Sequence, residues 1–174
     1  MKKLFLIYSF CILITSCKQE VSNENNFQNY LNTIPEIKLP FKSNSYIDLQ
    51  TKVEIDSTFK KFNSVDANGI YGKIKFNDSI TGIVYLYAGD NVFPKLITYN
   101  KKGNQISEQI LVNLPCGSDV NSSSCSSFVE LNNTFKISRI DTVISFLADG
   151  TEISTVVFAK YIIESNGKIS SLQE

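Results

Sequence analysis

The clearest structural signal in the chain is the stretch ITGIVYLYAGDNVFPKLITY, residues 80–99. It holds two runs rich in β-branched and aromatic residues, 80–87 and 92–99, and the pattern of each run has a period of two. Gly89-Asp90-Asn91 separates the runs, and these residue types favour tight turns. A short turn between two such runs predicts a pair of antiparallel strands.

The same pattern continues along the rest of the chain, where short segments rich in Asn, Asp and Gly separate further runs. The expected strands are Ile70–Phe76, Ile80–Tyr87, Val92–Tyr99, Gln105–Leu114, Ser127–Leu131, Phe135–Leu147, Glu152–Ile163 and Lys168–Leu172. They predict an all-β fold, an antiparallel meander of about eight strands. Because residues 83–87 are apolar on both faces, a second layer is required, and we expect a partial barrel or a two-layer sandwich.

Three local features add to this outline. Thr33–Tyr46 contains Pro35 and Pro40, which exclude a helix and predict an extended strand at a sheet edge. Ser57–Phe62 is the only segment in which a short helix is expected. The apolar phase slips within 135–147, which predicts a bulge near Ser138-Arg139.

Two hairpins also have similar sequences. Residues 96–107 and 143–154 align at a constant offset of 47 residues, each with an aromatic strand, a Gly in the turn and a returning strand. The alignment fits either an internal duplication or the independent use of one hairpin type.

The N-terminus has the composition of a secretory signal peptide. Lys2 and Lys3 precede a twelve-residue apolar run, 4–15, and the chain becomes polar directly after Cys17. A membrane-spanning helix needs about 20 apolar residues, so this run is too short to cross a bilayer.

The segment Ile14-Thr15-Ser16-Cys17 resembles the lipobox of bacterial lipoprotein precursors, with Ile in place of the commoner Leu. The resemblance implies cleavage before Cys17 and lipid addition to its sulfur, with two or three acyl chains that anchor the protein permanently. An ordinary secretory signal that ends near a cysteine is the alternative. The whole chain resembles the small cell-envelope lipoproteins of Bacteroidetes, which implies an envelope location, most naturally the outer membrane, and no particular activity.

This resemblance divides the chain into three parts. Residues 1–16 are the expected lipoprotein signal peptide, and residues 17–32 are polar, rich in Asn and expected to form a flexible tether. Residues 33–174 are the expected single β-rich domain, whose size suffices for one core.

The cysteines follow from the same division. Cys11 leaves with the leader and Cys17 carries the lipid, so Cys116 and Cys125 remain in a compartment that permits disulfides. We expect these two to pair. Two free thiols or a metal site are the alternatives, although the chain offers few further ligands for a metal.

Composition excludes several kinds of function. Removal of Lys2 and Lys3 leaves 15 basic and 17 acidic residues, a net charge of −2, and the only arginine is Arg139. A nucleic-acid partner is not expected, because phosphate binding relies on clustered basic residues. The chain has no His, so Ser-His-Asp and Cys-His catalysis and His-containing zinc sites are impossible, whereas paired carboxylates remain open. We expect no cofactor, no metal and no catalytic residue.

Aromatic residues supply the one candidate ligand-binding surface. Tyr85 and Tyr87 share a strand face and Tyr99 lies on the neighbouring run, so their rings could stack against a sugar or a peptide. Core packing is the alternative. Arg139 and Asp141 lie two residues apart on an extended segment and could form a structural ion pair on one face.

We consider three functions, of which the first is the one we expect and the other two are alternatives. The first is a membrane-anchored, non-enzymatic module that contacts the lipid bilayer through the acylated Cys17 and binds an envelope protein or glycan. The second is an inhibitor or immunity-type protein that blocks a lytic enzyme with the loop between Cys116 and Cys125. The third is a carboxylate-dependent hydrolase.

Overall fold

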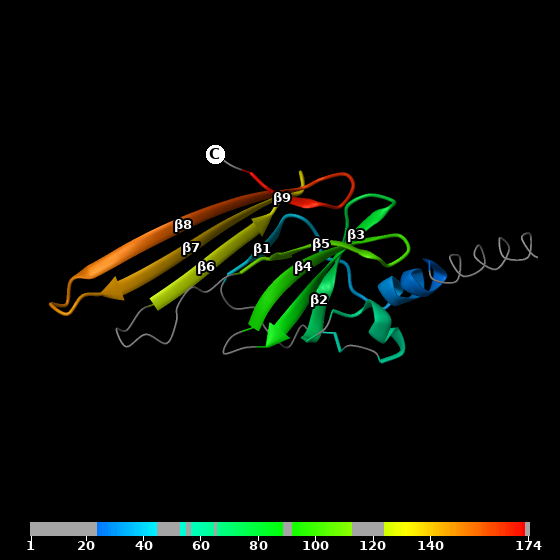
Figure 1. Cartoon of the computed structure of the whole chain (residues 1–174), viewed down its shortest axis with the longest axis horizontal. Helices are drawn as coiled ribbons and strands as arrows, with labels where there is room; N and C mark the ends of the chain where they lie inside the picture. The colour runs from blue at the N-terminus through cyan, green and yellow to red at the C-terminus, as the bar shows by residue number, and fades with distance from the viewer. Residues whose placement is uncertain are drawn as a thin grey trace, which may run out of the picture.

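The computed structural model describes residues 24–44, 53–54, 57–64, 66–88, 92–112 and 124–172. Within these ranges the chain forms a helix at residues 24–32, a 3-10 helix and nine strands (Figure 1). The elements are β1 Phe41–Ser43, η2 Ser57–Phe62, β2 Ala67–Lys75, β3 Ile80–Ala88, β4 Val92–Asn100, β5 Gln105–Ile110, β6 Ser124–Leu131, β7 Lys136–Phe146, β8 Glu152–Ile163 and β9 Ile169–Ser171. The all-β prediction is confirmed, and each of the eight expected runs overlaps one of the strands β2 to β9.

The strands form two antiparallel sheets that do not close into a barrel. The small sheet has the order β2-β3-β4-β5, and the large sheet has the order β1-β6-β7-β8-β9. The expected meander is therefore broken once, between β5 and β6, where the chain passes from one sheet to the other. β1 is an edge strand of the large sheet and pairs with β6, with Phe41 opposite Leu131, which confirms the extended edge strand expected in 33–46.

The main core lies between the two sheets. Side chains of β2, β3 and β4 pack there against side chains of β6, β7 and β8, and the group is completed by Phe41 of β1 and by residues 111–112. Val84 and Leu96 of the small sheet are fully buried, as are Val129 and Leu131 of the large sheet. The apolar face of each sheet is thus buried against the apolar face of the other, as two-layer packing requires.

The opposite face of the small sheet is covered by the N-terminal helix and by η2. Phe27, Tyr30 and Leu31 of the helix are buried and pack with Phe62 of η2 against the sheet, and Ile34 follows them. The prediction of a flexible tether over 17–32 is therefore wrong for residues 24–32. These residues fold because their apolar side chains at i, i+3 and i+4 form one face that the small sheet buries.

The helix also explains why β3 and β4 are apolar on both faces. Ile83 and Ile97 point toward the helix, whereas Val84 and Leu96 point toward the large sheet. The small sheet is the middle of three layers. Because both of its faces are buried, its strands are apolar at successive positions.

One turn type connects four hairpins. In the turns 100–104, 132–136, 147–151 and 164–168, the first residue donates its N–H to the carbonyl of the fifth and accepts from the N–H of the fourth. The fourth residue has a positive φ each time, at Gly103, Phe135, Gly150 and Gly167. This is the three-residue hairpin loop with a left-handed last position. The similarity of 96–107 and 143–154 thus reflects a turn used four times, not these two hairpins alone.

Candidate binding surface

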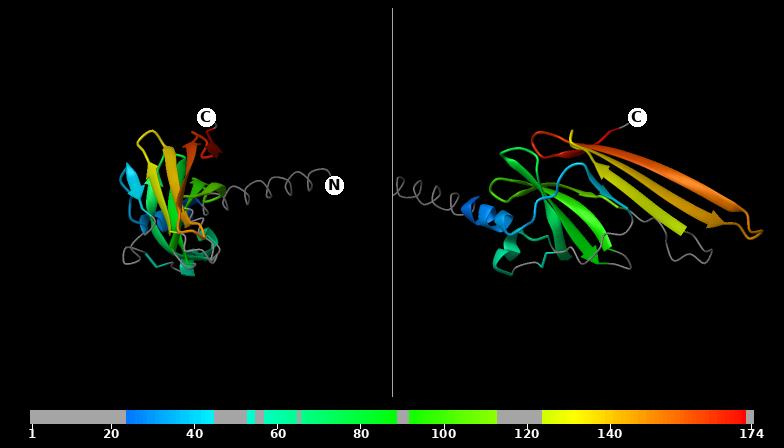
Figure 2. Two further views of the ribbon diagram at one scale, coloured as in Figure 1. Left: turned by 90° about the vertical axis from the view of Figure 1, so that its left-hand side faces the viewer. Right: turned by 180° about the vertical axis from the view of Figure 1, so that it is seen from behind.

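Half of the large sheet extends beyond the end of the small sheet (Figures 1 and 2). We call this part the arm; it consists of residues 124–128 of β6, 140–146 of β7 and 152–158 of β8. In β8 every residue from Glu152 to Phe158 is exposed, whereas Ile163 at the other end of the strand is buried in the core. The arm is therefore a three-stranded ribbon that the small sheet does not cover.

The pairing register assigns the side chains of the arm to two faces. Ile140 lies opposite Phe158, and Thr142 lies opposite Val156, so these side chains share one face. Because Val129 and Ile137, of the other parity, point into the core, this face is directed away from the small sheet. We call it the outer face; its apolar members are Phe128, Ile140, Ile144, Phe146, Val156 and Phe158.

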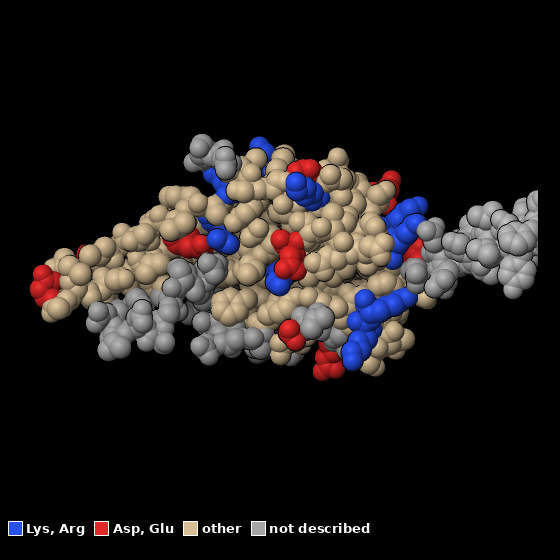
Figure 3. All heavy atoms as spheres, viewed as in Figure 1, with Lys and Arg blue, Asp and Glu red and all other residues tan. Residues whose placement is uncertain are grey.

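The outer face is unusually apolar for a surface. Phe158 is 65% exposed, Val156 46% and Phe146 40%. Phe158 lies opposite Ile140 and Val156 opposite Thr142, whereas Phe146, at the tip, lies opposite Glu152. Figure 3 shows that the arm carries charged side chains at its tip and near its base, with uncharged atoms between them. Contiguous apolar surface of this kind marks an interaction site in a soluble domain.

The opposite face of the arm is apolar as well. Ile153 and Val157 on this inner face are 44% and 49% exposed, because the small sheet ends before it reaches them. The ribbon thus lacks a protein layer on either face along much of its length, within the part of the chain that the structure describes.

A polar cluster lies where the arm leaves the core. Asp141 is buried; its Oδ1 accepts a 2.6 Å hydrogen bond from Ser127 Oγ, and its Oδ2 lies 2.9 Å from Arg139 Nε. Arg139 also donates to the carbonyl oxygen of Ile110 at the end of β5. The expected ion pair between Arg139 and Asp141 is confirmed, and it fixes the base of the arm to the last strand of the small sheet.

This cluster corrects the expected bulge at Ser138-Arg139. β7 pairs with β6 and with β8 in an unbroken register. The apolar phase slips because two positions that point toward the core, 139 and 141, hold a charged pair, while Ile140 points to the outer face.

Tyr85 and Tyr99 do not form the expected binding surface. Their side chains are 0% and 3% exposed and lie beneath the helix and η2. Tyr85 donates to the carbonyl oxygen of Phe62 at 3.0 Å and accepts from Tyr99 at 3.2 Å, and Tyr30 lies 3.0 Å from the same hydroxyl. These phenols fasten the helix and η2 to the small sheet, so the core-packing alternative is correct for them.

Tyr87 is more accessible. It lines a cavity of about 350 Å³ with Phe93, Lys95 and Ile110, and Lys95 Nζ lies 4.6 Å from its ring centroid. The Tyr87 hydroxyl donates to Ser64 Oγ. The ring is thus held by a cation and a hydrogen bond of the chain itself, and it offers one aromatic contact, not the expected set of three.

Alkaline titration should distinguish the buried phenols. Burial raises the pKa of Tyr30 to about 12 and raises the pKa values of Tyr85 and Tyr99 as well. A phenol of the unfolded chain ionises near pH 10, so above that pH the unfolded state loses protons that the folded state keeps. The stability that depends on these protonated phenols is therefore fully present below pH 10. Above pH 10 the free energy of unfolding falls, by up to about 1.4 kcal/mol per pH unit for each such phenol.

The measurement is urea unfolding between pH 8 and pH 11, with phenolate absorbance followed in parallel. Tyr85→Phe is the matched variant, and its stability should fall less steeply with pH. Full ionisation of all tyrosines while circular dichroism still reports the folded state would contradict the burial of these phenols.

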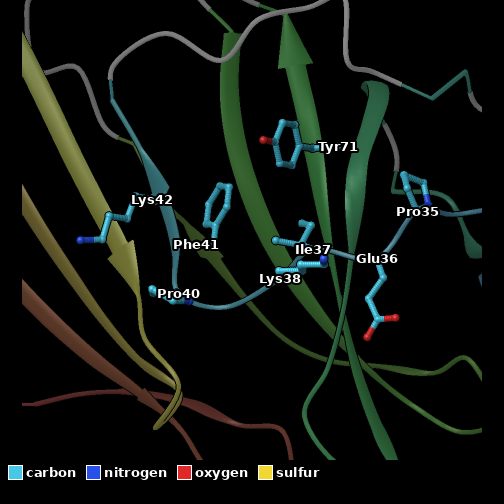
Figure 4. Close-up of a pocket in the computed structure, with 8 residues that line it drawn as sticks. All are labelled: Pro35, Glu36, Ile37, Lys38, Pro40, Phe41, Lys42 and Tyr71. Carbon is cyan, nitrogen blue, oxygen red and sulfur yellow. The ribbon is translucent and has the colours of Figure 1, made fainter.

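A second depression, of about 460 Å³, lies between residues 35–42, which lead into and include most of β1, and Tyr71 of β2 (Figure 4). Phe41 and Tyr71 face each other there with ring centroids 5.5 Å apart, while the side chains of Glu36 and Lys42 point in different directions. Its polar groups do not converge on a common point, so it provides no evident binding geometry.

Several predicted residues lie outside the described ranges. Cys17 and Cys116 are among them, whereas Cys125 belongs to β6. The lipidation of Cys17 and the pairing of Cys116 with Cys125 stay predictions. The loop on which the inhibitor hypothesis depends also falls largely in 113–123, outside those ranges.

No metal site emerges from the residues described, since no three Cys, Asp or Glu side chains gather in them. Asp141 is the one buried carboxylate in the same residues, and Arg139 neutralises it. None of the helices described has the length and apolar character needed to cross a membrane.

Comparison with known proteins adds no relative: no family model matches the chain, and no curated protein or solved structure matches it. The candidate site therefore rests on geometry alone. The sequence signal that could have located it is the run TEISTVVFAK, 151–160, which is β-forming, uncharged in its middle and apolar on both faces.

Proposed function

We propose that this protein is a lipid-anchored, non-enzymatic module of the bacterial cell envelope that binds another envelope protein through the outer face of its arm. The observation that carries the proposal is the exposure of Phe158, Val156 and Phe146 on one continuous face. Burial of apolar surface is the dominant favourable contribution to most protein association. An exposed Phe of this kind is a typical anchor of a protein interface.

The position of the helix supports an anchored arrangement. The helix begins at residue 24, seven residues after Cys17, and seven residues span at most about 25 Å when fully extended. The helix and the tip of the arm lie at opposite ends of the molecule (Figure 1). A lipid on Cys17 would therefore hold the helical end near the bilayer and leave the arm directed away from it.

Charge at the helical end fits the same orientation. Lys60 and Lys61 lie in the last turn of η2, whose Phe62 packs on Phe27 of the helix with ring centroids 5.1 Å apart. Lys101 lies 3.6 Å from Glu24 in the first turn of the helix. Figure 3 shows blue side chains gathered at this end, where they would lie near lipid headgroups, and basic residues near an anionic membrane surface add about 1 kcal/mol each.

A protein partner fits the outer face better than a glycan. Sugars need several hydrogen-bond donors and acceptors around an aromatic ring, whereas this face combines Phe, Ile and Val with scattered hydroxyls. No reaction is assigned, because the absence of His from the sequence removes the commonest catalytic arrangements.

Substitution of Cys17 by Ser tests the anchor. In a bacterial host with intact lipoprotein processing, the full-length chain should fractionate with the membrane and the Cys17→Ser variant should become soluble, since loss of two or three acyl chains removes nearly all membrane affinity. Cys125→Ser serves as the matched control and should stay in the membrane fraction. Membrane retention of the Cys17→Ser variant would contradict lipid anchoring at this residue.

A further inference from the structure

β8 has an open edge along most of the arm. It pairs with β7 over residues 152–162, whereas on its other side β9 pairs only with 161–163. Leu172 extends that side by one bond, from its N–H to the carbonyl of Lys160, and so closes the edge there. Among the residues described, no strand lies beside the remainder of β8, residues 152–158, which runs to the tip of the arm (Figure 1).

The hydrogen bonds at the two ends of β8 show which backbone groups point to the open side. The carbonyl of Thr151 accepts from the N–H of Leu147, toward β7. The N–H of Ile163 donates to the carbonyl of Phe135, again toward β7. Because the direction alternates along a strand in unbroken register, residues 152, 154, 156 and 158 direct their N–H and C=O groups outward.

This edge lacks the features with which proteins protect an edge strand. Natural edges are short, charged, interrupted by Pro or distorted by a bulge, because unpaired backbone groups recruit another strand. The segment from Ile153 to Ala159 contains no charge, no Pro and no Gly, and β8 pairs with β7 without a bulge. Its composition and its geometry are therefore those of a strand that receives a further strand.

We propose that the envelope partner binds by adding a strand of its own to the large sheet, beside residues 152–158 of β8. This mode of binding rests on the function proposed above and specifies which part of the partner is held, and how. Outward donors and acceptors that recur at every second residue match a segment in the extended conformation. An added strand would form up to about eight backbone hydrogen bonds with this stretch. It would end before Lys160, where Leu172 already occupies the edge.

The side chains of β8 indicate the composition of the added strand. Four exposed apolar side chains lie along the open stretch, two on each face: Val156 and Phe158 on the outer face, Ile153 and Val157 on the inner face. Adjacent strands place their side chains about 5 Å apart on the same face, so uncharged, β-branched or aromatic residues of the partner would extend both apolar surfaces. Glu152 is the only charged residue of this stretch, and a Lys or Arg of the partner strand would complement it at the tip.

Hydrogen exchange measured by NMR on residues 17–174 carrying Cys17→Ser tests whether the edge is open. The outward N–H groups of residues 154, 156 and 158 should exchange at least about tenfold faster than those of 153, 155 and 157, which bond to β7. Equal protection of the two sets would show that the edge is already covered, by the chain itself or by a second copy, and would overturn the proposal.

Photo-cross-linking in intact cells tests the added strand itself. With a photoreactive residue in place of Ile144 on the outer face, Ser154→Pro should lower the yield of the adduct with an envelope protein about tenfold. Proline removes the outward N–H and leaves a carbonyl of the added strand unpaired, while every bond to β7 remains. The circular dichroism of this variant should therefore match that of the parent chain. Ser154→Ala is the matched control, because it keeps the N–H and should keep the adduct.

Val156→Pro repeats the test at a second outward N–H and should lower the yield in the same way. Undiminished adduct from the folded Pro variants would overturn the added strand and leave binding through the outer face standing. Equal loss in Ser154→Ala and Ser154→Pro would trace the effect to the side chain and would overturn it as well, as would an adduct that contains only a second copy of this chain. Absence of any adduct from the parent chain would instead contradict the function proposed above, and the added strand with it.

Discussion

Phe27→Ala is expected to lower the free energy of unfolding by about 3–5 kcal/mol, the usual cost of removing a buried aromatic side chain. Phe27 is 0% exposed and contacts Phe62 and Tyr99 with ring centroids 5.1 Å and 5.6 Å away. The loss would detach the helix from the small sheet and expose the face that carries Tyr85. Urea unfolding of residues 17–174 with and without the substitution, followed by circular dichroism, measures the effect.

Gln28→Ala is the matched control, because residue 28 belongs to the same helix and is exposed. It should change stability by less than about 0.5 kcal/mol, as most surface substitutions do. Equal stability of the Phe27→Ala variant and the parent chain would show that residues 24–32 behave as a tether after all. A large loss would mean that the fold begins within a few residues of Cys17.

Asp141→Ala should destabilise the protein by a similar amount, about 3–5 kcal/mol, because it leaves a largely buried guanidinium without its counter-charge. Arg139 is 12% exposed, and its remaining contact is the carbonyl of Ile110. Ser127 would lose the acceptor of its 2.6 Å hydrogen bond as well. Thermal and urea unfolding of the variant give the magnitude.

The double variant Arg139→Met with Asp141→Leu separates the charge from the packing. Replacement of a buried ion pair by apolar residues of similar size is often neutral, so this variant should recover much of the lost stability. If the double variant were no more stable than Asp141→Ala, the cost would come from lost shape and not from the unpaired Arg139.

The strands were predictable because their signals are local. Period-two runs and turns with Gly, Asn or Asp fix each hairpin within about 20 residues, and the three-residue turn recurs at Gly103, Gly150 and Gly167. The break between β5 and β6 was not predictable, because no residue pattern between these strands indicates whether the next strand joins the same sheet or a second one.

The helix was missed for a different reason. Its segment is rich in Asn, which is a poor helix former, and composition alone favours a tether. The signal that could have identified it is the spacing of Phe27, Tyr30, Leu31 and Ile34, which fits one face of a helix. Its stability comes from packing on the small sheet, which no local pattern reports.

The candidate site shows the limit of periodicity most clearly. A strand that is apolar on both faces has the same sequence pattern whether both faces are covered, as in β3, or exposed, as in the arm. Tyr85 was therefore expected at a surface and lies in the core, while Phe158 was assigned to a strand and is 65% exposed. Which outcome occurs depends on how far each sheet extends in the folded protein. β3 has a protein layer on each of its faces, whereas the arm extends past the end of the small sheet.

Site-specific photo-cross-linking in intact cells tests most directly the proposed binding of another envelope protein to the outer face of the arm. A photoreactive residue in place of Ile144 lies in the middle strand of the arm, away from the β8 edge, while one in place of the exposed Asn104 serves as the control. If the outer face binds in this way, we expect a discrete adduct with a second envelope protein from position 144 and none from position 104. No adduct from position 144, or the same adducts from both positions, would contradict it.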